Sequence, residues 1–131
     1  MKNIQVTDEQ YVSLELAKLA KEKGLDFELD LGGNCVCYNN EGRLLSYHVH
    51  FQYPDRKEYI FAPTQSQLAK VLRDNVGIQV YAYSSTTNGL GEYKDYVVYI
   101  NGAPQNDSRD GEYKTYEEAM EFGLFTAIRN L

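Results

Sequence analysis

Several residue types that carry specialised chemistry are scarce in this sequence. It has no tryptophan, and among 131 residues only two cysteines, two histidines, two methionines and three prolines. Two cysteines are too few for the disulfide framework that staples small secreted domains. No apolar run approaches the roughly 20 residues that a membrane span needs, and residues 1–6 lack the apolar core of a signal peptide. The sequence therefore predicts a cytoplasmic protein without a membrane segment.

Positive charge is also scarce. Thirteen Lys and Arg face nineteen Asp and Glu, so the net charge is -6 and the pI is near 4.9. Phosphate neutralisation by cationic side chains supplies most non-specific nucleic-acid binding. No segment is basic enough to provide it, so we do not expect nucleic acid as the main partner.

Catalytic motifs are missing as well. The sequence contains no Gly-x-Ser-x-Gly, no phosphate-binding loop, no Gly-x-Gly-x-x-Gly and no His-Glu-x-x-His. A Cys–His pair would still need an orienting third group and an oxyanion hole, and neither is indicated. We expect a protein that is not an enzyme and holds no cofactor.

The clearest secondary-structure pattern lies in residues 62–84, which predict a helix that runs directly into a strand. Pro63 keeps its neighbour extended, and Thr64 with Gln67 forms a capping box that starts a helix. Apolar residues follow at helical spacing, and Gly77 is placed to end the helix in a left-handed conformation. The period then changes to two, which predicts a strand over 78–84. The apolar helical positions are Leu68, Val71, Leu72 and Val76.

Two further helices begin with the same kind of cap. Thr7 and Gln10 predict a helix that runs past Val12 to Gly24, and Thr115 with Glu118 predicts a terminal helix. Gly123 lies inside the terminal helix, where it costs roughly 1 kcal/mol, so we expect the backbone to approach another element closely there. The expected buried face of the terminal helix is Tyr116, Ala119, Met120, Leu124, Ala127, Ile128 and Leu131.

The remaining apolar segments alternate with polar residues, which is typical of half-buried strands. Strands are predicted over 25–31, 35–38, 44–53, 59–61 and 93–101. The strands over 35–38 and 44–53 form a hairpin, and the strand over 93–101 pairs with the one over 78–84. Short connections and alternation favour antiparallel pairing. The sequence predicts a single α+β domain over 1–131, mainly an antiparallel sheet with about three helices packed on it.

The hairpin contains four residues with the chemistry of zinc ligands, namely Cys35, Cys37, His48 and His50. The expected register pairs Tyr38 with Arg43, which sets both histidines further along the strand than the cysteines. Same-face neighbours on a strand are roughly 6–7 Å apart, whereas zinc ligands converge to about 2.0–2.3 Å from the metal. Reduced thiols are therefore the favoured interpretation, and a zinc site is the alternative.

A loop before the terminal helix resembles a calcium-binding loop in its spacing. Oxygen-bearing side chains stand at loop positions one, three and five, with glycine at six and an acid at twelve. Asn replaces the usual first Asp, Ser stands at the third position, and a strand precedes the loop. The alternative is a polar turn that leads to the helix cap. The candidate ligands are Asn106, Ser108, Asp110 and Glu117.

Tyrosine is abundant, with twelve copies, and five of them lie on the two paired strands of the second half. Tyrosine suits a protein-binding surface because it is large, amphipathic and loses little entropy. Aromatic residues on a sheet also stack nucleic-acid bases, but such platforms normally lie in a basic groove. A third interpretation is half-buried tyrosine over a small core. The candidate residues are Tyr81, Tyr83, Tyr93, Tyr96 and Tyr99.

Four segments resemble a group of small uncharacterised proteins from phages, prophages and mobile elements of gut anaerobic bacteria. They are Leu14–Gly24, Ala62–Gln65, Val71–Ile78 and Tyr116–Leu124. Members often carry Trp where this sequence has Val71. The resemblance implies a phage-related cytoplasmic accessory protein and supplies no catalytic residues to map. The tyrosine-bearing strands, which carry little basic charge and no catalytic groups, predict that the partner is another protein or a second copy of the chain.

The predicted order from Thr64 to Leu131 is also similar to a double-stranded-RNA-binding domain, with a helix, strands and a terminal helix. Such a domain opens its last helix with a lysine cluster. Here that position reads Tyr116-Glu117-Glu118, which opposes phosphate binding.

Overall fold

The computed structural model describes residues 11–25, 34–48, 60–86, 94–106 and 113–131. The predicted strand over 25–31 falls almost entirely outside these ranges, as do residues 49–53 of the predicted hairpin. In chain order the elements are α1 (Leu14–Glu22), β1 (Asn34–Tyr38), β2 (Leu44–His48), β3 (Ile60–Phe61), α2 (Gln65–Val71), the π-helical turn η1 (Leu72–Val76), β4 (Val80–Thr86), β5 (Lys94–Ile100), β6 (Ala103–Pro104) and α3 (Tyr116–Arg129).

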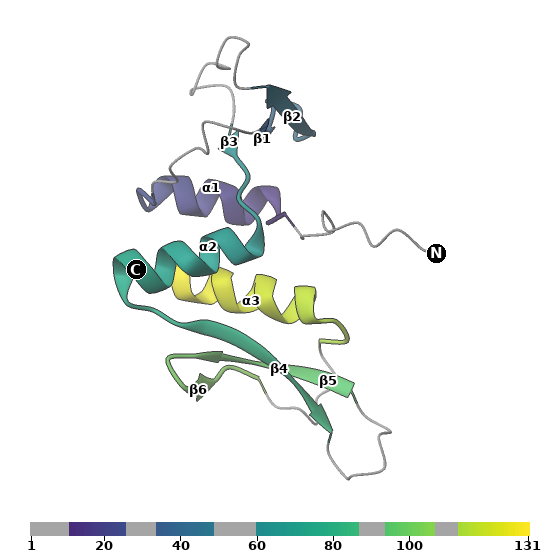
Figure 1. The fold of residues 1–131 in the computed structure, drawn as a ribbon, viewed down its shortest axis with the longest axis vertical. Helices are drawn as coiled ribbons and strands as arrows, with labels where there is room; N and C mark the ends of the chain where they lie inside the picture. Colours follow the sequence, from purple (N-terminus) through teal and green to yellow (C-terminus); the bar gives the residue numbers. More distant parts are fainter. Residues whose placement is uncertain (1–10, 26–33, 49–59, 87–93, 107–112) are drawn as a thin grey trace.

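The predicted α+β class with antiparallel strands is confirmed. The described strands divide into two three-stranded sheets, ordered β2-β1-β3 and β4-β5-β6, rather than forming one. The helices lie between the two sheets, with α3 against β4 and β5 and α1 against β3 (Figure 1). None of the described helices is long and apolar enough to cross a membrane.

The central helix begins as predicted. The Thr64 side chain accepts from the Gln67 N–H at 3.1 Å, and the Gln67 side chain accepts from the Thr64 N–H at 2.9 Å. Gly77 ends it in the left-handed region at φ 78°. The last turn is a π-helix, which the sequence pattern does not reveal. It changes the phase of the helix, and Val76 is 39% exposed although helical spacing predicted its burial.

The first helix begins later than predicted. Ser13 is its N-cap, and its side chain accepts from the Leu16 N–H at 3.2 Å. Tyr11 forms an antiparallel bridge with Thr64, and the Val12 N–H donates to the Pro63 carbonyl at 3.0 Å. The backbone of Tyr11 and Val12 is thus paired with the segment before α2, so these two residues are not helical. The predicted cap at 7–10 lies outside the described residues.

The β1–β2 hairpin has a different register from the expected one. Tyr38 pairs with Leu44 and not with Arg43. The Gly42 N–H donates to the Asn39 carbonyl at 3.0 Å, and Gly42 has φ 79°. A turn followed by a left-handed glycine adds one residue to the loop and shifts the pairing.

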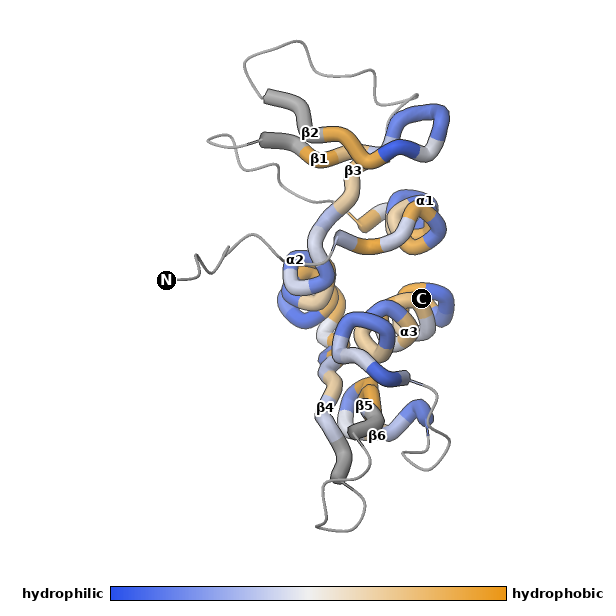
Figure 2. Tube along the Cα trace, turned by 90° about the vertical axis from the view of Figure 1, so that its right-hand side faces the viewer, coloured by the Kyte–Doolittle hydropathy of each residue, from blue (hydrophilic) through white to orange (hydrophobic). Residues whose placement is uncertain are grey.

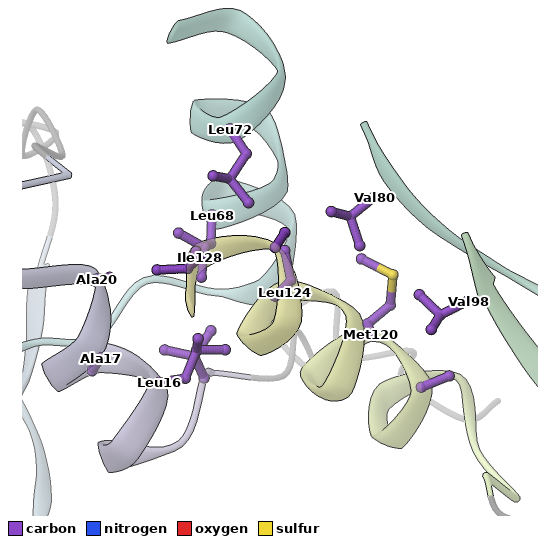
Figure 3. Packing of buried hydrophobic residues seen from close by; sticks show 13 residues of the cluster. Leu16, Ala17, Ala20, Leu68, Leu72, Val80, Val98, Met120, Leu124 and Ile128 are labelled. Atoms are coloured by element: carbon purple, nitrogen blue, oxygen red, sulfur yellow. The ribbon is translucent and has the colours of Figure 1, made fainter. Parts of the chain in front are cut away.

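The core lies where the helices meet the inner face of the β4–β5–β6 sheet (Figure 3). Gly123 makes the predicted close approach, since a Cβ atom there would lie 2.4 Å from Val98 Cγ2. Tyr116 and Leu131 are 44% and 42% exposed, contrary to the predicted burial: Tyr116 is the first residue of α3, and Leu131 follows its last residue, Arg129. The core residues are Val12, Leu16, Ala17, Ala20, Leu68, Leu72, Val80, Val98, Ala119, Met120, Leu124, Ala127 and Ile128.

Candidate functional site

Three of the predicted tyrosines gather on the outer face of the β4–β5–β6 sheet. Tyr81 and Tyr99 are cross-strand partners, and their rings stack with centroids 5.3 Å apart at 13°. Tyr83 meets both rings edge-on, at 5.3 Å from Tyr81 and 6.1 Å from Tyr99. We call Tyr81, Tyr83 and Tyr99 the tyrosine face.

Alternation along the strands explains why these rings point outward. Val80, Ala82 and Val98 belong to the opposite face, which packs on α3, so the odd-numbered residues face away from the core. Val97, the register partner of Tyr83 on β5, is only 7% exposed. Tyr83 is 63% exposed, the most of the three.

The other two candidate tyrosines do not join this face. Tyr96 lies on the inner face and meets Tyr116 of α3 edge-on, with centroids 6.2 Å apart. Tyr93 lies outside the described residues. The pairing of β4 with β5 was predicted correctly. The candidate tyrosines were grouped by strand, however, and two tyrosines on the same strand can lie on opposite faces of the sheet.

The tyrosine face combines aromatic rings and phenol hydroxyls with few neighbouring charges in the sequence. Residues 78–100 contain one lysine, Lys94, and two acids, Glu92 and Asp95. Aromatic faces and phenol hydroxyls offer apolar area and hydrogen bonds, which suits protein recognition. In the described part of the chain, no group of three His, Cys, Asp or Glu is placed to hold a metal ion.

The candidate calcium loop is described only at its two ends, because Ser108 and Asp110 lie outside the described residues. The Asn106 Oδ1 accepts from the Val98 N–H at 2.9 Å, and its Nδ2 donates to the Tyr96 carbonyl at 2.9 Å. Asn106 thus extends the sheet by mimicking a strand residue along β5. The exposed Glu117 lies in the first turn of α3, following the Thr115 cap, whose side chain accepts from the Glu118 N–H at 3.1 Å. These bonds favour the turn-and-cap interpretation.

Asn106→Ala is expected to lower the free energy of unfolding by about 1–2 kcal/mol, because two hydrogen bonds to β5 are lost at a partly exposed position. Chemical denaturation measures this loss.

The melting temperature of the unaltered protein is expected not to change in calcium at about 10 mM, well above the weakest dissociation constants of protein calcium sites. A calcium-dependent rise that Glu117→Gln removes would instead support the metal site.

The candidate zinc ligands are only partly described. Cys37 is buried and pairs in register with Leu45, whereas Cys35 pairs with Tyr47. His48 pairs with Asn34 at the end of the hairpin, and His50 lies outside the described residues.

A polar junction that the sequence did not indicate ties three helices and β1 together. We define it as Tyr38, Ser13, Gln65 and Glu121. The Glu121 carboxylate accepts from the Ser13 N–H at 2.9 Å and from Gln65 Nε2 at 3.4 Å. Gln65 Nε2 also donates to the Glu117 carbonyl at 2.8 Å. Ser13 and Gln65 lie far from Glu121 in the sequence, so no local sequence pattern predicts these hydrogen bonds.

Tyr38 completes the junction by donating its hydroxyl to the Val12 carbonyl at 2.7 Å. Burial raises the pKa of the Tyr38 hydroxyl above 10.0, and the nearby charges of Glu121 and Glu15 add to the effect. The folded protein therefore keeps this proton at a pH where the unfolded chain loses it.

Tyr38→Phe is expected to lower the free energy of unfolding at pH 7 by about 0.5–1.5 kcal/mol through the lost hydrogen bond. The Tyr38 contribution is fully present below the unfolded pKa of about 10 and is lost as pH rises through the raised folded pKa. Alkaline destabilisation should therefore be weaker in the Phe variant. Urea denaturation from neutral pH to about pH 11 measures both effects, and parallel curves for the two proteins would contradict the assignment.

Comparison of the chain with protein-family models, curated proteins and solved structures finds no match in any of the three.

Proposed function

We propose that the chain is a non-enzymatic accessory protein of a phage or mobile element, acting in the bacterial cytoplasm, and that it binds another protein through the tyrosine face. The observation that carries the proposal is the cluster of Tyr81, Tyr83 and Tyr99 on the outer side of a sheet whose other side is occupied by α3. The sequence resemblance to phage and mobile-element proteins supports the biological setting.

Binding through the tyrosine face is physically plausible because it combines a stacked pair of rings, Tyr81 and Tyr99, with one exposed ring, Tyr83. The stacked pair Tyr81 and Tyr99 holds its geometry before any partner arrives, which lowers the entropy lost on binding. Tyr83 stands beside this pair with most of its surface in water. Buried tyrosines near the centre of an interface commonly dominate its binding energy.

Base stacking by the same rings is the rival function. It would need cations along the face, and the single lysine of residues 78–100 is outnumbered by two acids. A gel shift at low salt with single-stranded DNA and RNA tests this rival, because real binding would fall steeply as salt rises.

Tyr83→Ala is expected to weaken capture of the partner by about 30-fold, the effect of losing about 2 kcal/mol at a binding hot spot. The immobilised full chain would be exposed to bacterial lysate, and bound proteins would be quantified by mass spectrometry. Tyr116→Ala is the matched control, since Tyr116 is also exposed but lies on α3. Equal capture by both variants and the unaltered protein would contradict a role for the tyrosine face.

A further inference from the structure

The strand that carries two of the three tyrosines lies at the edge of its sheet. The order β4-β5-β6 gives β4 one described neighbour, β5, and leaves its other long side without a strand among the described residues. Figure 2 shows β4 at one edge of this sheet, on the side of β5 away from β6. Its sequence, Val-Tyr-Ala-Tyr-Ser-Ser-Thr, contains no charge, proline or glycine. Edge strands normally carry such features to prevent pairing with other chains.

The hydrogen-bond pattern shows which backbone groups of β4 face the open side. The Asn101 N–H donates to the Gln79 carbonyl at 2.9 Å, so the backbone N–H and C=O groups of Gln79 point toward β5. These groups alternate in direction along a strand, so the backbone groups of Tyr81 and Tyr83 point toward β5 as well. On β5, the Val98 carbonyl accepts from the Gln105 N–H at 2.9 Å on the far side. Val98 is the partner of Ala82, so the N–H and C=O groups of Ala82 point to the open edge, as do those of Val80 and Ser84.

We infer that β4 pairs with β4 of a second copy of this chain, antiparallel about a two-fold axis at Tyr83. The inference rests on the proposed function and names the partner of the same surface. Residues that face the open edge must pair with each other, and the register that overlaps the whole strand sets Ala82 opposite Ser84. In that register Tyr83 lies opposite Tyr83 of the second copy, as a pair without backbone hydrogen bonds between its members, which brings side chains closest.

The strand is self-complementary in this register. The register sets Tyr81 opposite Ser85 and Val80 opposite Thr86. Only Tyr83 meets itself, and aromatic cross-strand pairs stabilise antiparallel sheets. Each chain carries a net charge of -6, so two copies repel each other on approach. The uncharged β4 strand lets them meet without opposing like charges.

One strand pair and the adjoining rings form a smaller contact than the roughly 1,200–2,000 Å² of a stable interface. We therefore expect a reversible dimer that dissociates on dilution, with two sheets joined into one and the tyrosine faces continuous across the axis. The paired strands would cover Ala82 and Ser84 main-chain groups and much of Tyr83.

Charge variants at the symmetry axis test the register. Sedimentation velocity on the full chain should show dimer for the unaltered protein at high concentration. Tyr83→Glu and Tyr83→Lys should each be monomeric under the same conditions, because like charges then face each other. An equimolar mixture should restore the dimer, because Glu faces Lys only if position 83 meets itself. The paired controls Tyr116→Glu and Tyr116→Lys should dimerise normally, and melting curves verify that every variant is folded.

Amide hydrogen exchange provides a second test that needs no substitution. The Ala82 and Ser84 amides should exchange at least about 10-fold more slowly at high protein concentration than at low concentration, in line with the fraction of dimer. The Tyr81 and Tyr83 amides, bonded to β5, should be protected at both. A protein that stays monomeric at every concentration overturns self-pairing, and so does a dimer that survives Tyr83→Glu. Capture of another protein that depends on Tyr83, by a chain that is monomeric, would overturn self-pairing while supporting the proposed function.

Discussion

Replacing Leu124 by alanine is expected to lower the free energy of unfolding by about 2–5 kcal/mol, the range for deleting a fully buried leucine. Leu124 has no exposed surface. Figure 3 shows its side chain on α3 in the same interior as Leu68 of α2 and Leu16 of α1. The elements that surround this position come from distant parts of the chain, so the cavity left by the lost atoms cannot collapse easily.

Thermal and urea unfolding measure this effect, and two substitutions serve as controls. Leu124→Met keeps the volume and is expected to cost less than about 1.5 kcal/mol. Leu131→Ala removes a leucine that is 42% exposed and should change stability by less than about 0.5 kcal/mol. Equal losses at Leu124 and Leu131 would mean that the helices do not enclose a common core.

The sequence predicted features that depend on neighbouring residues. The capping box of Thr64 and Gln67 and the left-handed stop at Gly77 require only local bonds. The pairing of β4 with β5 also followed, since their alternation and short connection favour a hairpin. Local chemistry determines these features, so a single sequence suffices to predict them.

Errors arose where distant segments compete for the same backbone. A capping pattern at 7–10 predicted a helix through Val12, but Val12 is bonded to Pro63, whose position in space no local pattern gives. The error in the hairpin register is instead local, because Gly42 adopts a left-handed conformation in the turn and shifts the pairing by one residue. The polar junction at Glu121 was missed because its partners Ser13 and Gln65 lie far away in the sequence.

In the candidate site, too, the locally determined features were predictable and those that depend on tertiary packing were not. Alternation along β4 predicts that Tyr81 and Tyr83 share a face, and the observed register brings Tyr99 to them. Tyr96 lies on the inner face, which its spacing from Val98 already indicated. What the sequence could not give is the position of β4 at the edge of the sheet formed by the described strands, because strand order depends on tertiary packing.

Helix α3 approaches the sheet closely at Gly123. Gly123→Ala is expected to lower the free energy of unfolding by about 1–3 kcal/mol through overpacking, although alanine favours an isolated helix by roughly 1 kcal/mol over glycine. The new Cβ would lie 2.4 Å from Val98 Cγ2 and 3.0 Å from Val80 Cγ1. Both neighbours are branched side chains on the inner face of the sheet, so α3 must move away from β4 and β5 to admit the methyl group.

A second substitution separates this clash from any other cause. Val98→Ala removes the methyl group at 2.4 Å, leaving the Val98 Cβ at 3.4 Å from the new atom, which is ordinary contact. The double variant should therefore be more stable than the sum of the two single losses predicts, by at least about 1 kcal/mol. Urea denaturation of the four proteins gives this coupling energy. A Gly123→Ala protein as stable as the original, or single losses that simply add, would show that α3 does not pack on β5 at Gly123.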